Sequence, residues 1–171
     1  DGAARCGAVI GLCPTTEANL GDGLFDLPAW SDASNGAWGI GSDSHASVDA
    51  AEELRLLEYG QRLARQQRNV MVAEELWSAA VRGGAQAAGR PIAGLAVGQQ
   101  ADFLVLADAM FDGLSPARQL ASHLFANHRR DALREVWVGG QRVIDHGRHA
   151  AEAAAQRSFL AARARLLEAL R

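Results

Sequence analysis

The sequence predicts an α/β fold in two parts, in which the end of a wound α/β layer is followed by a small β-rich unit. Two short, nearly continuous apolar runs in the first quarter of the chain suit strands buried on both faces, as in a parallel sheet. Segments with helical periodicity come after the second run. Farther along, two β-type runs separated by Gly139-Gly140 indicate a hairpin. A hairpin does not continue the winding, so it predicts a separate β-unit.

Two strands and a connecting loop are expected before the first long helix. Residues 8–13 form the first strand, and Pro14 ends it. Residues 14–28 are rich in Thr, Asn, Asp and Gly, which favour turns and irregular backbone, so this stretch is predicted to be a loop. Residues 37–41 form the second strand, which runs directly into a Ser-Asp-Ser-His sequence.

Two helices are expected next. The first begins near Asp49, because Asp49 followed three residues later by Glu52 resembles a capping box. The second covers residues 73–82. Gly83 and Gly84 are predicted to break it, since glycine is a poor helix former.

The second part is predicted to be mostly β-structure until a final helix. Residues 103–106 form a strand, and residues 134–145 form the hairpin. Residues 151–171 are Ala-rich and helical. We expect this helix to pack on its own domain through an apolar stripe, with pairing to another subunit as the alternative. The stripe comprises Phe159, Leu160, Leu166, Leu167 and Leu170.

Composition argues against several classes of protein. The 171 residues are 49% hydrophobic, which is enough for one domain with a core or for pieces of two. The net charge is −3 and the Arg residues are scattered, so no nucleic-acid partner is expected. No apolar run approaches the ~20 residues that span a bilayer, so no membrane association is expected.

The start of the chain and its cysteines add further expectations. The chain has no initiator Met and opens inside an apolar pattern, which predicts a piece of a longer protein. It does not open with the charged and then apolar order of a signal peptide. Cys6 and Cys13 match no standard zinc spacing and are predicted to be buried thiols in a reducing compartment.

Asp43 is the candidate for chemistry, because it lies just past the end of the second predicted strand. In a (β/α)8 barrel, catalytic residues gather at the C-terminal ends of the strands. A carboxylate there can bind a divalent metal through one oxygen and take a proton from metal-bound water with the other. From the residues alone the alternative stays open that Asp43 is a helix cap or a turn residue.

Three stretches, in order, resemble the amidohydrolase superfamily. Residues 38–45 (WGIGSDSH) resemble its eighth barrel strand, after which an Asp ligates the catalytic metal. Residues 94–106 (GLAVGQQADFLVL) resemble the return of the chain into its β-sandwich domain. Residues 136–144 (VWVGGQRVI) resemble the sandwich hairpin that follows.

This resemblance implies a division of the chain into three parts. Residues 1–90 would be the C-terminal strands and helices of a metal-dependent (β/α)8 TIM barrel. Residues 91–150 would be part of a small β-sandwich domain, and residues 151–171 a C-terminal helix.

Within the superfamily, residues 11–23 (GLCPTTEANLGDG) and 41–59 resemble the formimidoylglutamate deiminase family of histidine breakdown. The resemblance implies a cytoplasmic, homodimeric hydrolase with one zinc ion per full-length subunit. Its small-molecule substrate would be N-formimidoyl-L-glutamate, and the products N-formyl-L-glutamate and ammonia. Asp43 would ligate the zinc, accept a proton from the zinc-bound water and pass it to the leaving nitrogen.

The polar segment after the first strand is a candidate wall of the substrate pocket, together with His45. The alternative is that these side chains satisfy their own backbone. The candidates in this segment are Thr15, Thr16, Glu17, Asn19 and Asp22.

The histidines and the Glu that complete the superfamily's metal site are absent. None of the five histidines (His45, His123, His128, His146, His149) stands in a matching context. A zinc site normally needs three or four protein ligands, so the site is expected to be incomplete and the chain inactive alone. Two other hypotheses stay open, another aminohydrolase of the superfamily and a non-catalytic binding domain.

Overall fold

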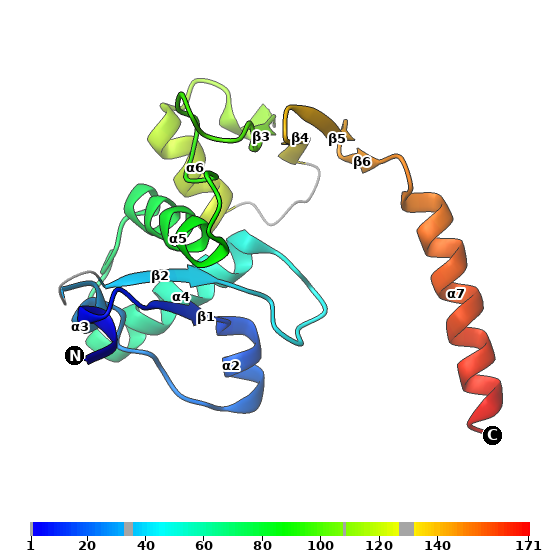
Figure 1. The fold of residues 1–171 in the computed structure, drawn as a ribbon, viewed down its shortest axis with the longest axis horizontal. Coiled ribbons are helices and arrows are strands. Elements are labelled where there is room, and N and C mark those ends of the chain that lie inside the picture. Colours follow the sequence, from blue (N-terminus) through cyan, green and yellow to red (C-terminus); the bar gives the residue numbers. More distant parts are fainter. Residues whose placement is uncertain (1, 33–35, 108, 127–131) are drawn as a thin grey trace.

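Two parallel strands begin the fold (Figure 1). The computed structural model describes residues 2–32, 36–107, 109–126 and 132–171. After a short helix, α1 (Gly2–Arg5), strand β1 (Val9–Leu12) pairs in parallel with β2 (Ala37–Ile40). Leu12 lies opposite Ile40, so the two strands end at the same level. Both predicted strands are confirmed.

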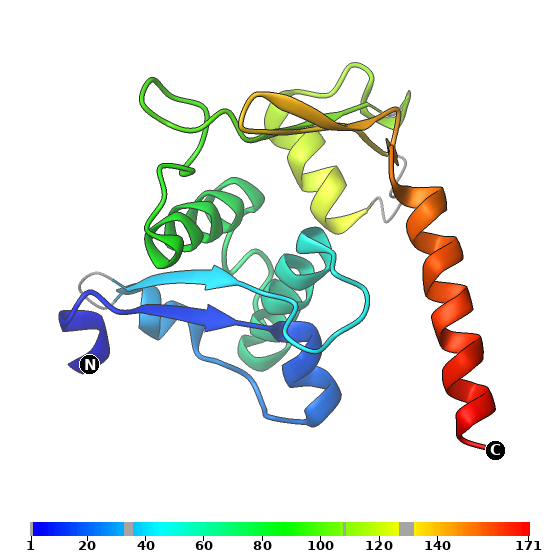
Figure 2. The same cartoon turned by 45° about the vertical axis from the view of Figure 1, so that its right-hand side comes forward.

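Two long helices pack on this strand pair. Helix α4 (Ala50–Arg65) begins after Asp49, whose carboxylate accepts hydrogen bonds from the amides of Ala51 (2.9 Å) and Glu52 (3.2 Å). The predicted start of this helix is confirmed. Helix α5 (Ala73–Ala88) packs closely on β2, and Figure 2 shows it lying over the strand pair. The core forms where these elements meet, around the fully buried Leu27, Trp38, Leu54, Leu76 and Leu124.

The segment between the two strands is largely helical, so the predicted loop over residues 14–28 is wrong. Helix α2 (Pro14–Leu20) starts at the proline that ends β1, because proline suits the first turn of a helix. The Glu17 carboxylate accepts a hydrogen bond from the Cys13 amide (2.7 Å), which satisfies a donor at the helix start. Helix α3 (Leu27–Asp32) follows. The composition of this segment favours turns, but Pro14 and the Glu17–Cys13 hydrogen bond favour a helix start at this point.

The predicted break at Gly83 and Gly84 is also wrong, because α5 continues through both residues. A Cβ on Gly83 would lie 1.8 Å from the Trp38 carbonyl oxygen. Glycine at this position therefore allows the helix axis to approach the strand backbone more closely than any side chain permits.

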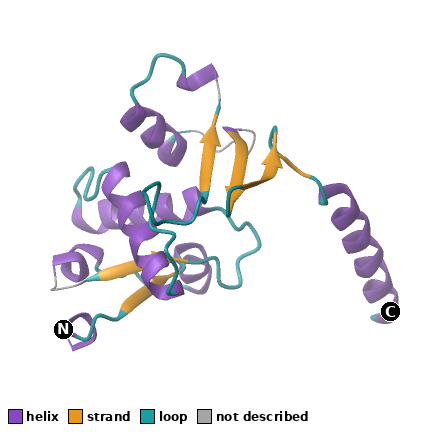
Figure 3. Cartoon of the chain, turned by 45° about the horizontal axis from the view of Figure 1, so that its top comes forward, coloured by secondary structure: helices purple, strands orange, loops and turns teal. Residues whose placement is uncertain are grey.

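The second part contains one four-stranded antiparallel sheet. Strands β3 (Phe103–Leu106), β4 (Leu133–Val138), β5 (Gln141–Asp145) and β6 (Arg148–His149) lie in that order. The β4–β5 hairpin and its Gly-Gly turn are confirmed, and both turn glycines have positive φ angles. Figure 3 shows this sheet apart from the β1–β2 pair. The mixed α/β composition predicted from the sequence is confirmed.

A helix that the sequence did not predict joins the two parts. After a single 3-10 turn, η1 (Ala109–Phe111), helix α6 (Pro116–Phe125) packs against α4 and α5. Its Leu124 is fully buried in the same core as Leu54. Although α6 lies between two strands of the antiparallel sheet in sequence, it belongs to the packing of the first part.

His123 of α6 is buried, with 7% of its surface exposed. The structure gives its Nδ1 atom no hydrogen-bond partner among the described residues. Burial lowers the pKa of His123 below its ordinary value, and the nearby Asp49 opposes this shift. The neutral imidazole is therefore the form that the core accommodates.

We expect His123 to make stability depend on pH. Because the folded pKa is depressed, the unfolded chain takes up the proton first as pH falls through about 6.5. Its contribution to stability is thus full above that pH and is lost below it. Urea unfolding at pH 7.5 and pH 5.5 should show a smaller difference for His123→Leu than for the unsubstituted chain. Equal differences in the two proteins would contradict this assignment.

The final helix, α7 (Glu152–Ala169), extends away from the rest of the chain in all three overall views (Figures 1, 2 and 3). None of its residues is buried, and Phe159 and Leu170 are 62% and 75% exposed. The expectation that the stripe packs on its own domain is therefore wrong. Arg163 lies over the Phe159 ring, so a charged side chain separates Phe159 from the leucines farther along the predicted stripe.

Deleting residues 152–171 is expected to leave the stability of the remainder nearly unchanged, within about 0.5 kcal/mol, because exposed side chains contribute little. Urea unfolding followed by tryptophan fluorescence measures this directly, since the deleted segment holds no Trp. A loss of several kcal/mol would show that α7 packs on the chain in solution.

Neither cysteine is fully buried. Cys6 is exposed and Cys13 partly so, and the prediction that both thiols are buried is wrong. Cys6 lies in the turn that follows α1, outside the core. No helix in the described ranges is long and apolar enough to cross a bilayer.

Candidate active site

The candidate site forms where β1 and β2 end together. The Gly41 amide donates a hydrogen bond to the Leu12 carbonyl (2.9 Å), which extends the strand pairing by one residue. A Cβ on Gly41 would lie 3.3 Å from the Cys13 sulfur, so the two segments touch just beyond the strands. The parallel register therefore brings the start of α2 against the Ser-Asp-Ser-His turn.

Asp43 lies in this turn with its side chain exposed. Its φ of 46° places it in the left-handed region, which Asp tolerates better than most residues. The preceding Ser42 carbonyl accepts two hydrogen bonds, from the His45 amide (2.9 Å) and from the Thr16 hydroxyl (3.1 Å). The backbone that carries the Asp43 carboxylate is thus held from two sides.

The other candidate residues fall into three groups. Thr15 and Glu17 use their side chains within the fold, since Thr15 bonds to Glu53 and Glu17 bonds to the Cys13 amide. Asn19 and Asp22, near the end of α2, have exposed side chains. Thr16 and His45 both meet the Ser42 carbonyl, so the structure brings them to the turn of Asp43, whereas it leaves Asn19 and Asp22 farther along the segment.

Sequence reasoning missed Glu53, which is 2% exposed. Its carboxylate accepts hydrogen bonds from the Thr15 amide (2.9 Å) and the Thr15 hydroxyl. A signal was present, because Glu53 lies four residues before the buried Leu57 and so shares its inward face of the helix.

The Cys13 thiol at the strand ends lies near three carboxylates. Partial burial raises the pKa of the Cys13 thiol, and the carboxylates of Asp43, Glu17 and Glu53 raise it further. A backbone hydrogen bond with Gly41 acts in the opposite direction and lowers this pKa.

Comparison with known proteins identifies the family. The amidohydrolase family profile matches residues 2–143. The chain belongs to this family. It is 47% identical to formimidoylglutamate deiminase from Pseudomonas aeruginosa over 96% of its length. The chain spans 38% of that relative.

Solved structures agree with this membership. An amidohydrolase from Brucella melitensis superposes with a TM-score of 0.90 at 40% identity, over 96% of this chain and 38% of that one. A variant of atrazine chlorohydrolase from Arthrobacter aurescens, crystallised with zinc and atraton, superposes with a TM-score of 0.72 at 25% identity. This match covers 86% of the present chain and 33% of the chlorohydrolase chain. The prediction that this amidohydrolase chain carries part of a TIM-barrel enzyme is confirmed.

Potential metal donors in the described part of the chain are few near Asp43. Within the described ranges, no group of three or more His, Cys, Asp or Glu side chains could hold a metal ion. Asp43 supplies one carboxylate where a zinc site normally needs three or four protein ligands.

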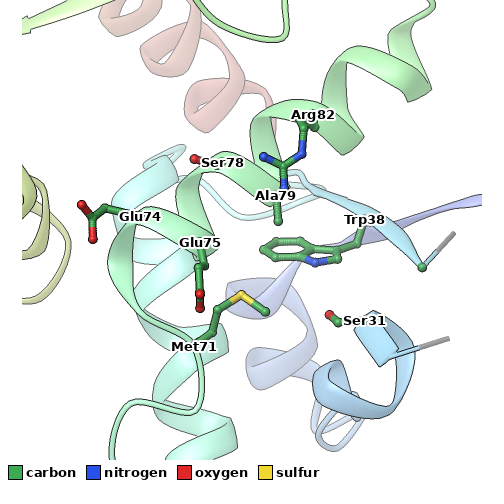
Figure 4. A pocket seen from close by; sticks show the side chains of 9 residues that line it. Ser31, Trp38, Met71, Glu74, Glu75, Ser78, Ala79 and Arg82 are labelled. Atoms are coloured by element: carbon green, nitrogen blue, oxygen red, sulfur yellow. The ribbon is translucent and has the colours of Figure 1, made fainter. Parts of the chain in front are cut away.

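A cavity of about 520 Å³ lies elsewhere, beside the start of β2 and α5. Figure 4 shows the Trp38 ring between Arg82 and Met71. Gly36, just before β2, also lines this cavity, so it opens at the strand end opposite to Asp43. In barrel enzymes that end serves stability, and chemistry takes place at the other end.

Proposed function

We propose that this chain is the C-terminal portion of a zinc-dependent hydrolase that converts N-formimidoyl-L-glutamate and water to N-formyl-L-glutamate and ammonia. The observation that carries the proposal is the exposed Asp43 carboxylate at the joint ends of two parallel strands, on a fixed turn. The similarity to formimidoylglutamate deiminase supports the choice of substrate. The remaining metal donors would come from parts of the enzyme outside this chain.

The proposed role of Asp43 is proton transfer. Hydrolysis of an amidine adds water to the formimidoyl carbon and expels ammonia, so a proton must move from the water to the leaving nitrogen. An exposed carboxylate at the strand ends can accept that proton and return it. Asp43 would also be one metal ligand of the whole enzyme. His45 and the α2 segment (Thr15, Thr16, Glu17, Asn19, Asp22) would contribute to the pocket wall, directly or by holding it in place.

A chimera tests this function. The part of the Pseudomonas aeruginosa deiminase that this chain does not match would be joined to residues 1–171. We expect ammonia release from N-formimidoyl-L-glutamate. Release from a purine or pyrimidine, with none from formimidoylglutamate, would favour another aminohydrolase instead.

The isolated chain provides the second arm of the test. We expect the purified 171-residue chain to hold less than stoichiometric zinc and to hydrolyse nothing. Tight stoichiometric zinc with hydrolysis would contradict the proposal that the site is shared. Size-exclusion chromatography of the chimera would test the homodimer that the family resemblance implies.

A further inference from the structure

Glu53 is a buried carboxylate that the proposed reaction does not use. A buried charge is costly unless hydrogen bonds compensate for it. Both compensating bonds come from Thr15, the second residue of α2, through its amide and its hydroxyl. Glu53 therefore anchors the start of α2 to α4.

The anchored segment continues directly to the turn of Asp43. Thr16 follows Thr15 and is 3% exposed, and its hydroxyl donates to the Ser42 carbonyl (3.1 Å). That carbonyl belongs to the peptide bond that precedes Asp43. The path from Glu53 to the Asp43 backbone therefore has two hydrogen-bonded steps, and α2 connects them.

The conformation of Asp43 explains why such an anchor matters. The left-handed region is less favourable than the right-handed one even for Asp, so this conformation depends on the surroundings that hold it. The Thr16 hydroxyl and the His45 amide hold it here through the Ser42 carbonyl. If α2 moved away from α4, the first of these two bonds would be lost.

We propose that Glu53 is a positioning residue for Asp43, acting through Thr15, Thr16 and the Ser42 carbonyl. The structural half of this proposal concerns the chain alone. The kinetic half rests on the proposed function. Glu53 touches neither the reacting atoms nor Asp43 itself in this role.

Hydrogen–deuterium exchange of the 171-residue chain tests the structural half. Glu53→Gln and Thr16→Val should speed exchange in the peptide that covers residues 41–47 by about fivefold, as expected for loss of one hydrogen bond. Thr16→Ser keeps a hydroxyl and should restore slow exchange. The matched control is Glu58→Gln, because Glu58 is equally buried on α4 but bonds to Arg62 (2.9 Å) and the Met71 amide (3.1 Å).

The outcomes decide the proposal. Unchanged exchange in either Glu53→Gln or Thr16→Val would overturn it, because the proposed path needs both steps. Equal acceleration by Glu58→Gln would overturn it too, because the effect would then be general loosening of α4. If Glu53→Gln does not fold, Thr15→Val takes its place, because it removes the hydroxyl that donates to Glu53 and leaves the carboxylate unchanged.

The chimera tests the kinetic half. Glu53→Gln should lower kcat by about tenfold to a hundredfold with KM within twofold, since small displacements of a reacting group have effects of that size. Glu58→Gln should leave kcat unchanged. An inactive unsubstituted chimera would refute the proposed function and leave the exchange result standing. An active chimera in which Glu53→Gln keeps full kcat would overturn the positioning role.

Discussion

Replacing Asp43 by Asn is expected to lower kcat of the chimeric enzyme by about 10²- to 10⁴-fold, the usual contribution of a general acid–base residue. Asn has nearly the same shape as Asp and also tolerates the left-handed conformation, so the turn should survive. What is lost is the ability to accept a proton, together with the negative charge that would help to hold the metal. Initial rates of ammonia release, measured over a range of substrate concentrations, separate this loss from a change in KM.

The control for this prediction is Asp112→Asn, the same chemical change at an exposed position that follows η1. It should leave kcat and KM unchanged. Circular dichroism should show the same fold for both variants. If Asp43→Asn keeps kcat within twofold, the carboxylate has no part in proton transfer. Asp43 would then be a turn residue without a role in the reaction.

The placement of Asp43 could be predicted from the sequence because it depends on local patterns. The apolar runs that became β1 and β2 are continuous, and such runs occur in strands covered on both faces. Once two parallel strands are expected, their C-terminal ends must meet at one edge. A polar residue directly after the second strand is then placed without knowledge of any long-range contact.

The surroundings of Asp43 could not be predicted in the same way. The helix α2 depends on the Glu17 carboxylate reaching the Cys13 amide, while turn-forming residues dominate the composition of the whole segment. Glu53 lies 38 positions from the Thr15 that it binds. Periodicity shows that Glu53 faces inward, but it does not show what the carboxylate meets there.

The two adjacent glycines of α5 show most clearly that sequence patterns do not reveal long-range contacts. By propensity, Gly83 and Gly84 are equivalent helix breakers. In the structure they differ completely, because Gly83 faces the backbone of β2 and Gly84 has nothing within 4 Å of its Cβ position. Only the packing of α5 on β2 distinguishes Gly83 from Gly84. The stabilities of the two alanine variants can measure this distinction.

Gly83→Ala is expected to destabilise the fold by about 3 kcal/mol or more, the upper range for overpacking a core. Its Cβ would lie 1.8 Å from the Trp38 carbonyl oxygen and 2.4 Å from the carbonyl carbon. These atoms are backbone and cannot rotate away, so α5 would have to move off the sheet. Gly84→Ala should instead stabilise the fold by up to about 1 kcal/mol, because alanine is the better helix former and meets no neighbour. Urea unfolding of both variants at pH 7.5 measures the contrast. If Gly83→Ala were as stable as Gly84→Ala, α5 would not lie this close to β2 in solution, and the core around Trp38 would have to be packed differently.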